Sequence, residues 1–261
     1  MAILVLPYHA SAMARNLTVQ ALVLRGRNMG EIHRLVTLFT AELGIVQAIA
    51  YGANRTKSRL RPVTISFVEL QAYLYHDPVR DSYKVVDLVA CREFVSIRGS
   101  VIKFYTASLM AEVAVAGRGG GGDSPRLLSL ILEGLSLLDL SAEELATPLA
   151  VQFLWRYLWL AGLQPELDRC AACGVTLSPQ QPMVLSPHDG ASRCSRCADH
   201  DSWVLSPEDR RYLAASANLP LAAATAVQSS GLVPLKRVLY RLTELALDTR
   251  LRSVSVGAGI L

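Results

Sequence analysis

The sequence has little charge and no long uninterrupted apolar run. Only 18% of its 261 residues are charged and 7% are aromatic, whereas 51% are apolar, which excludes a disordered chain and leaves enough apolar side chains for a core. The most apolar stretch, residues 151–163, contains Gln152 and Arg156 and falls short of the roughly 18 residues of a membrane span. Residues 1–6 are too few for a signal peptide. We expect a cytoplasmic protein with no membrane segment.

Motifs of the common enzyme classes are missing. The sequence has no G-x-S-x-G, H-E-x-x-H or G-x-x-x-x-G-K-[ST], and its five histidines are scattered. Gly117, Gly119 and Gly122 have the G-x-G-x-x-G spacing, but they follow a predicted helix instead of a strand, so no dinucleotide site is expected. Because no nucleophile has a visible base, the chain is not expected to be an enzyme.

The positive charge is concentrated near the N-terminus. The net charge is +4, yet residues 1–76 hold eight arginines and lysines against three acidic residues, a surplus of five. The remainder of the chain is therefore close to neutral. This distribution predicts one anionic partner for the N-terminal region.

The first third of the chain has the pattern of short strands. Alternation of apolar and polar residues and intervening turns predict five strands, at residues 18–25, 33–40, 45–52, 66–76 and 83–90. Five short strands in this length fit a small closed barrel of the OB type. Residues 1–90 are assigned to this barrel.

Helical periodicity follows. Helices are expected at residues 94–116, 125–140, 142–163 and 206–217 and along the apolar stripe from Leu232 to Ala246. Ser141 and Glu144 have capping-box spacing, and Ser206 opens a further helix start. The predicted fold class is α+β multidomain: the barrel, a helical bundle of residues 91–164 and 206–261, and an insertion of residues 165–205.

The insertion contains a double C-x-x-C pattern. Cys170 and Cys173 form one pair, and Cys194 and Cys197 the other, which is the arrangement of a four-thiolate zinc site. With four thiolate ligands no coordination position stays open, so one structural Zn²⁺ is predicted. Disulfides, and replacement of one cysteine by His188 or His200, are the alternatives. The fifth cysteine, Cys91, is expected to be a buried small side chain.

A basic segment lies between two predicted strands. Arg55, Lys57, Arg59 and Arg61 alternate with small or apolar residues, a pattern that can follow a phosphate backbone. OB barrels combine such grooves with stacking aromatics, for which Tyr51, Tyr73 and Tyr75 are candidates. A solvated surface loop and aromatic packing within the barrel are the alternatives.

Several of these segments carry a resemblance to a known family. Residues 24–31 (LRGRNMGE), 35–44 (LVTLFTAELG), 51–53 (YGA) and 57–59 (KSR) resemble the opening of RecO, a bacterial recombination mediator. Residues 1–12 precede the usual start of the family, and translation from Met13 would give a more typical beginning. The order of barrel, helices and four-cysteine insertion is also similar to RecO.

The resemblance implies a non-enzymatic protein of DNA repair. It would bind single- and double-stranded DNA, anneal complementary strands, assist RecA loading with RecR, and contact the C-terminal tail of the single-stranded DNA-binding protein. It would associate with the nucleoid when bound to DNA. The family signature assigns phosphate contacts to the barrel cations, Arg25, Arg27, Arg34, Arg55, Lys57, Arg59 and Arg61. Glu31 would pair with a nearby arginine.

Two other functions fit parts of the pattern. A zinc-containing OB-fold protein that binds RNA or acts in translation would share the barrel and the cysteines. A zinc-dependent hydrolase would need a site that the sequence does not reveal. Competition between DNA and RNA distinguishes the RNA-binding protein from a DNA-binding protein. Loss of turnover on metal removal would identify the hydrolase.

Overall fold

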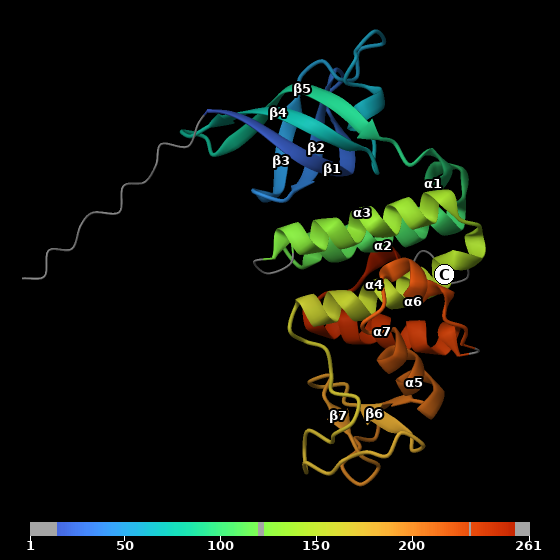
Figure 1. Ribbon diagram of the computed structural model, residues 1–261. Coiled ribbons are helices and arrows are strands. Elements are labelled where there is room, and N and C mark those ends of the chain that lie inside the picture. Colours follow the sequence, from blue (N-terminus) through green and yellow to red (C-terminus); the bar gives the residue numbers. More distant parts are fainter. Residues whose placement is uncertain (1–14, 120–122, 230, 254–261) are drawn as a thin grey trace, which may run out of the picture.

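The computed structural model describes residues 15–119, 123–229 and 231–253; the expectations about residues 1–12 and Gly122 lie outside them. A barrel occupies one end of the molecule, a layered group of helices the middle, and a small three-stranded sheet the other end (Figure 1). None of the described helices is long and apolar enough to cross a bilayer.

The predicted five-stranded barrel is confirmed. Its strands are β1 (Asn16–Met29), β2 (His33–Thr40), β3 (Gly44–Ala50), β4 (Glu69–Asp77) and β5 (Ser82–Arg92). They close in the order β1-β2-β3-β5-β4, and all neighbours are antiparallel except β3 and β5. Alternate side chains fill the interior, so that Val36, Leu38 and Ala48 are fully buried. The short 3-10 helix η1 (Pro62–Thr64) lies between β3 and β4.

Seven α-helices follow in the described part of the chain. They are α1 (Val95–Gly99), α2 (Val101–Ala116), α3 (Ser124–Leu140), α4 (Ala146–Leu160), α5 (Pro207–Ser216), α6 (Leu221–Ala226) and α7 (Leu232–Leu247), with the 3-10 helix η2 (Glu143–Leu145) before α4. Most of α4 is buried between α2, α3 and α7, which explains its nearly continuous apolar sequence.

Helix starts differ from the sequence prediction at two places. The helix expected from residue 94 is divided at Ser100, whose hydroxyl accepts from Lys103 N and caps α2. The capping box expected at Ser141 and Glu144 is wrong, because Ser141 ends α3 in an extended conformation and its side chain caps nothing. Ser206, by contrast, forms a complete capping box with Asp209 at the start of α5.

The barrel and the helices share a core. Leu22, Leu24, Phe39 and Phe67 point out of the barrel and are buried among helical side chains, and the Phe67 ring meets Phe104 of α2 edge to face at 5.5 Å. This apolar contact fixes the barrel against α2 and α3.

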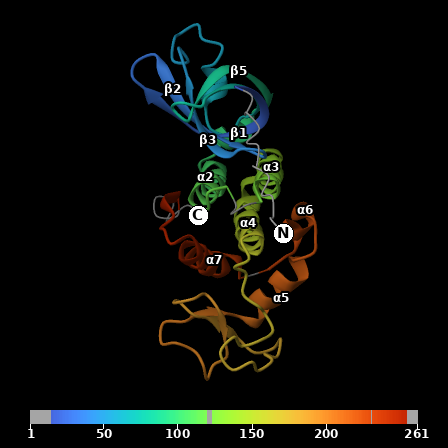
Figure 2. The same ribbon diagram turned by 90° about the vertical axis from the view of Figure 1, so that its left-hand side faces the viewer.

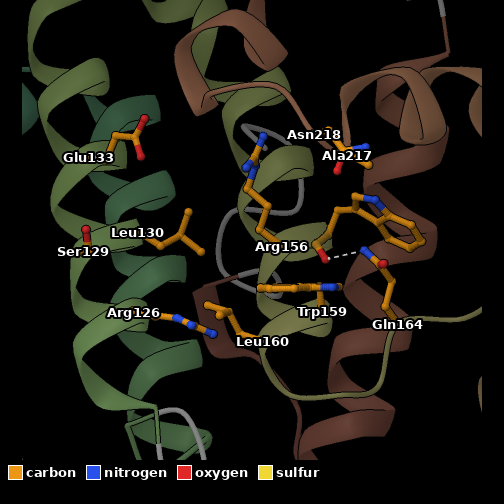
Figure 3. A pocket seen from close by; sticks show the side chains of 11 residues that line it. Arg126, Ser129, Leu130, Glu133, Arg156, Trp159, Leu160, Gln164, Ala217 and Asn218 are labelled. Atoms are coloured by element: carbon orange, nitrogen blue, oxygen red, sulfur yellow. Dashed lines mark hydrogen bonds between the residues drawn. The ribbon is translucent and has the colours of Figure 1, made fainter.

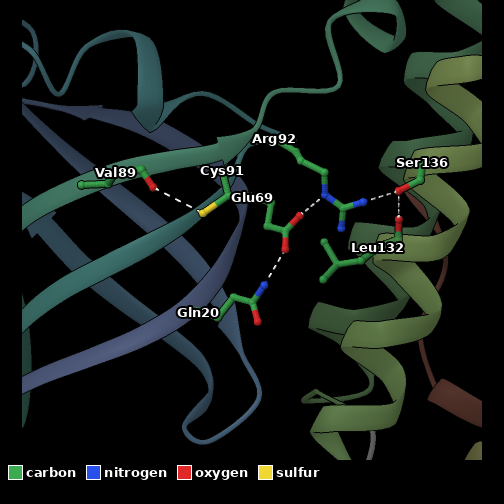
Figure 4. Close-up of polar contacts among 7 residues, drawn as sticks. All are labelled: Gln20, Glu69, Val89, Cys91, Arg92, Leu132 and Ser136. Atoms are coloured by element: carbon green, nitrogen blue, oxygen red, sulfur yellow. Dashed lines mark hydrogen bonds and ion pairs between the residues drawn. The ribbon is translucent and has the colours of Figure 1, made fainter.

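Polar contacts reinforce the junction between barrel and helices (Figure 4). Arg92, the last residue of β5, pairs with the buried carboxylate of Glu69 and donates to Ser136 Oγ of α3 at 2.8 Å. Gln20 Nε2 donates to the other Glu69 oxygen at 2.6 Å. The Glu69 carboxylate is thus satisfied by partners from both neighbouring strands, as a buried charge requires.

The small sheet consists of β6 (Met183–Leu185), β7 (Ser192–Arg193) and β8 (Trp203–Leu205) in the order β7-β6-β8. Met183, Leu185 and Leu205 are buried in the same core as the helices. Gly190 packs closely against Leu242 of α7, to which an added Cβ would approach within 2.5 Å, and its φ of +70° favours glycine. The insertion is therefore packed onto the helices and is not a freely attached module.

Candidate nucleic-acid interface and metal centre

The basic segment, residues 51–61, is fastened to the turn between β1 and β2. Gly52 N donates to His33 Nδ1 at 3.1 Å, Asn54 N donates to the Ile32 carbonyl at 3.0 Å, and Ala53 between them is fully buried in the barrel core. Gly52 has a φ of +70°, a conformation that favours glycine. Although the segment has no regular secondary structure, its first residues are held in place.

The seven predicted phosphate-contacting cations lie on β1, on β2 and on the basic segment. Arg25 and Arg27 are exposed on β1 and face Thr37 and Leu35 across the ladder with β2. The remaining cations are Arg34 on β2 and, exposed on the segment, Arg55, Lys57, Arg59 and Arg61. In Figure 2 the segment after β3 lies on the side of the barrel away from α2 and α3.

The cations have few counter-charges. Among the described residues, Arg59 is the one member of the set with a carboxylate within 4.0 Å, Asp87 at 3.8 Å. Glu31, expected to pair with an arginine, is exposed in the hairpin turn and forms no ion pair with the described residues. Cations without counter-charges on one domain create a positive potential that attracts anions.

Arg34 differs from the other cations. It is half-buried and its guanidinium packs against Gly26, beside the Thr64 carbonyl. A Cβ added to Gly26 would lie 2.7 Å from the guanidinium and 2.0 Å from the Thr64 carbonyl oxygen. Burial lowers the pKa of Arg34, and the neighbouring charge of Arg61 lowers it further. Its Nε is buried without a hydrogen-bond partner. Arg34 and Arg61 thus form a pair of like charges beside η1.

The three candidate tyrosines are not equivalent. Tyr51 is 51% exposed, whereas Tyr73 and Tyr75 are half-buried on the outer face of β4. The Tyr73 hydroxyl donates to Gln71 Oε1 at 3.0 Å, and Lys84 Nζ lies 5.5 Å above the Tyr75 ring. Tyr51 alone of the three belongs to the basic segment.

The four predicted metal ligands converge at the base of the insertion. The sulfurs of Cys170, Cys173, Cys194 and Cys197 all lie within 4.8 Å of one another, and those of Cys173 and Cys194 are 3.8 Å apart. Gly174 N donates to the Cys170 carbonyl at 2.8 Å, and Cys197 N donates to the Cys194 carbonyl at 3.0 Å, so the chain turns tightly at each C-x-x-C. The four cysteines can hold a metal ion.

Thiol ionisation within the cluster is uneven. Burial opposes ionisation of Cys170, but backbone hydrogen bonds at Cys194, Cys173 and Ala172 outweigh it and lower the pKa of Cys170 to about 6. The thiols of Cys194 and Cys173 raise the pKa of Cys197 to about 12. A bound cation relieves this competition because it stabilises all the thiolates together.

The structure bears on the alternatives to a four-cysteine site, which were disulfides and a histidine ligand, and on the prediction for Cys91. All five cysteines are free thiols, and the metal-competent cluster of the described residues does not include His188 or His200; the His200 side chain is fully exposed. The prediction of a buried Cys91 is wrong. The register of β4 and β5 shifts where Glu69 pairs with Arg92 and Leu70 with Ala90, and Cys91 is the extra, exposed residue at that bulge.

A cavity of about 640 Å³ lies beside α3 and α4, and sequence reasoning missed it (Figure 3). Its apolar lining includes Leu130 and Trp159, the latter 60% exposed, and its charged lining consists of Arg126, Glu133 and Arg156. The Trp155 side chain also lines it, with a buried Nε1 that has no partner. The apolar run around residues 151–163 obscured this site because it resembles a helix buried on all sides.

Comparisons with known proteins cover nearly the whole described chain. The model described as "Recombination protein O N terminal" matches residues 13–92, and "Recombination protein O C terminal" matches residues 98–255. The two matched segments correspond to the barrel and to the helices with their insertion.

Individual relatives are similar over long stretches. DNA repair protein RecO of Heliobacterium modesticaldum is 34% identical over 195 residues, which is 72% of this chain and 68% of the relative. DNA repair protein RecO of Rubrobacter xylanophilus is 31% identical over 78% of this chain and 82% of the relative. DNA repair protein RecO of a Synechococcus strain is 26% identical over 92% of this chain and 84% of the relative.

Proposed function

Because the chain belongs to the RecO family of DNA repair proteins, we propose that it is a non-enzymatic mediator of recombination. It binds single- and double-stranded DNA, anneals complementary strands, and assists RecA loading together with RecR. It acts in the cytoplasm and associates with the nucleoid when bound to DNA. We assign three domains to it: the barrel of residues 1–90, the helical domain of residues 91–164 and 206–261, and the insertion of residues 165–205.

One observation carries the proposal: the cations predicted on the barrel have almost no carboxylate partners. Six of the seven lack a carboxylate within 4.0 Å among the described residues. A phosphate backbone supplies the missing negative charge and releases counterions as it binds. Because the basic segment carries no base-reading Gln, and its Asn54 is engaged with the His33 carbonyl, binding is tolerant of sequence.

The function is tested with the full chain and labelled oligonucleotides. Binding of single- and double-stranded DNA at moderate salt, together with acceleration of annealing between complementary strands, is the expected result. An RNA strand of the same sequence is the competitor. Displacement of DNA by RNA at lower concentration than by unlabelled DNA favours the alternative, an RNA-binding or translation-associated protein.

The metal is proposed to be one structural Zn²⁺ held by Cys170, Cys173, Cys194 and Cys197. A tetrahedron with zinc–sulfur bonds of about 2.3 Å has edges of about 3.8 Å. The separation of the Cys173 and Cys194 sulfurs, 3.8 Å, equals that edge. When bound, the ion cross-links the two C-x-x-C turns, and with four thiolates it leaves no position for a substrate. The insertion bears five acidic residues and three arginines, which makes it a poor DNA contact.

The cavity beside α3 and α4 is the proposed site for the C-terminal tail of the single-stranded DNA-binding protein. That tail is acidic and ends in apolar residues, and the cavity combines the exposed Trp159 ring with Arg126 and Arg156. Aromatic and arginine side chains dominate the binding energy of such interfaces.

A labelled tail peptide tests this site. Trp159→Ala should weaken peptide binding at least tenfold, while DNA binding, which depends on the barrel, stays at the parental value. Leu140→Ala, a loss of another exposed apolar side chain on the helices, is the control and should leave peptide binding unchanged. Unchanged peptide affinity in Trp159→Ala would place the tail elsewhere.

A further inference from the structure

Tyr51 occupies a position that the phosphate contacts alone do not explain. It is the first residue after β3, and the cations of the basic segment follow it immediately. Half of its surface is exposed although it is aromatic, and no described residue hydrogen-bonds to its hydroxyl. An exposed ring at the start of a basic segment is the arrangement that proteins use to stack on a base of a single strand.

The Tyr51 ring packs against His33 on one side. His33 meets it at an angle of 77° with 5.0 Å between ring centroids, so His33 covers at most one face. His33 is itself fixed because its Nδ1 accepts from Gly52 N at 3.1 Å and its carbonyl accepts from Asn54 Nδ2 at 3.3 Å. Tyr51 thus contacts a fixed imidazole on one side and leaves the rest of its ring open to a ligand.

A cation lies beside the residue that follows Tyr51. The side chain of Arg55 folds over Gly52: a Cβ there would lie 3.6 Å from Arg55 Cδ and 4.0 Å from its Cζ. Grooves that bind single strands combine a stacking ring with nearby cations that contact the phosphates, and Tyr51 and Arg55 provide one of each within five residues. Tyr73 and Tyr75 lack this combination, since their polar contacts lie on the sheet face and involve Gln71 and Lys84.

We propose that Tyr51 stacks on an unpaired nucleobase and thereby makes the barrel bind single-stranded DNA more tightly than double-stranded DNA. The inference rests on the proposed DNA binding, and it adds a separate, non-electrostatic contribution. Stacked bases inside a duplex do not offer a free face to the ring, whereas bases of a single strand do. The cations contact the phosphates of both DNA forms, whereas Tyr51 stacks only on bases of the single-stranded form.

The test compares three ligands: an oligothymidylate, the same strand with abasic sites, and a duplex. Tyr51→Leu keeps an apolar contact with His33 but offers no aromatic face, and Tyr51→Phe restores the face. Tyr51→Leu should weaken binding of the oligothymidylate on the order of 5- to 100-fold, the range for loss of one stacking contact. Duplex affinity and the dependence of single-strand affinity on salt should match the parent, because no charge has changed.

The abasic strand separates stacking from any displacement of the segment. The parent and Tyr51→Phe should bind it more weakly than the intact strand, and Tyr51→Leu should bind both nearly equally. Tyr73→Ala is the matched control and should behave as the parent does. If Tyr51→Leu still discriminates against the abasic strand as strongly as the parent, Tyr51 does not stack, while the proposed DNA binding stands. If the parent binds none of the three ligands, the proposed function fails and this inference with it.

Discussion

Arg210 of α5 donates to the carbonyl oxygen of Ser178 at 2.7 Å and so connects the helices to the cysteine insertion. The same guanidinium donates to the carbonyls of Leu167, Leu177 and Gln181. Arg210 is only 4% exposed, and burial lowers its pKa. A single buried side chain therefore satisfies the backbone of the segment on either side of the first C-x-x-C turn.

Arg210→Ala should destabilise the protein by about 3 kcal/mol or more, because several buried carbonyls lose a charged donor at once. The free energy of unfolding in urea measures this. Arg211→Ala removes an exposed neighbour on the same helix and should change the stability by less than about 0.5 kcal/mol. Equal stability of the two variants would show that the Arg210 hydrogen bonds contribute little.

Cys173→Ser should abolish stoichiometric metal binding and destabilise the insertion. Metal analysis of the purified protein is expected to give one zinc per parental chain and less in the variant. Affinity for single-stranded DNA should stay within about twofold, because the cations lie on the barrel at the opposite end of the molecule (Figure 1). A folded variant that no longer binds DNA would make the insertion part of the DNA site.

Gly26→Ala should misplace the cation pair beside η1. The added Cβ would lie 2.0 Å from the Thr64 carbonyl oxygen, and backbone cannot yield as a flexible side chain does. We expect destabilisation on the order of 2 kcal/mol by overpacking and weaker DNA binding through Arg34 and Arg61. Thermal unfolding and DNA titration measure the two effects. Parental values in both measurements would show that η1 moves freely.

The buried Lys236 of α7 makes the stability of the fold depend on pH. It is 1% exposed, its Nζ donates to Thr147 Oγ1 at 3.2 Å, and burial, then the charge of Arg237, lowers its pKa. A lysine with a lowered pKa loses its proton in the folded state first, so stability should rise with pH between the folded pKa and about 10.4, the value in the unfolded chain.

Lys236→Met should therefore stabilise the protein at neutral pH by on the order of 1 kcal/mol and remove that rise. Urea unfolding at several pH values between neutral and 10 measures both. A variant that is less stable than the parent, with the rise unchanged, would mean that Lys236 is stabilising in its charged form.

Patterns local in the sequence predicted much of this fold. The alternation along Gln71 to Tyr75 identified β4, and the C-x-x-C spacing identified the cysteine cluster, because both depend on near neighbours in the chain. The bulge that exposes Cys91 and the use of Ser141 as a helix end depend on tertiary pairing, which a single sequence does not reveal. The same holds for the cavity at Trp159, which needs α3 and α5 beside α4.

The sequence predicted which cations belong to the proposed DNA site, but not the contacts that position them. The basic segment was visible as alternating charges, whereas its attachment through His33 and the Asp87 partner of Arg59 are contacts between distant parts of the barrel. That partner matters for experiment. Arg59 is partly neutralised, so Arg55 and Lys57 are the better pair for testing phosphate contact.

The central claim, that the unpaired cations of the barrel neutralise DNA phosphates, is tested most directly by a salt series of single-stranded DNA binding. The double variant Arg55→Ala with Lys57→Ala should lower the slope of log affinity against log salt by roughly 1.4, about 0.7 for each lost phosphate contact. Arg237→Ala with Arg241→Ala, an equal loss of charge on α7, should leave the slope unchanged. A parental slope in the barrel variant, or an equal decrease in both variants, would contradict the claim.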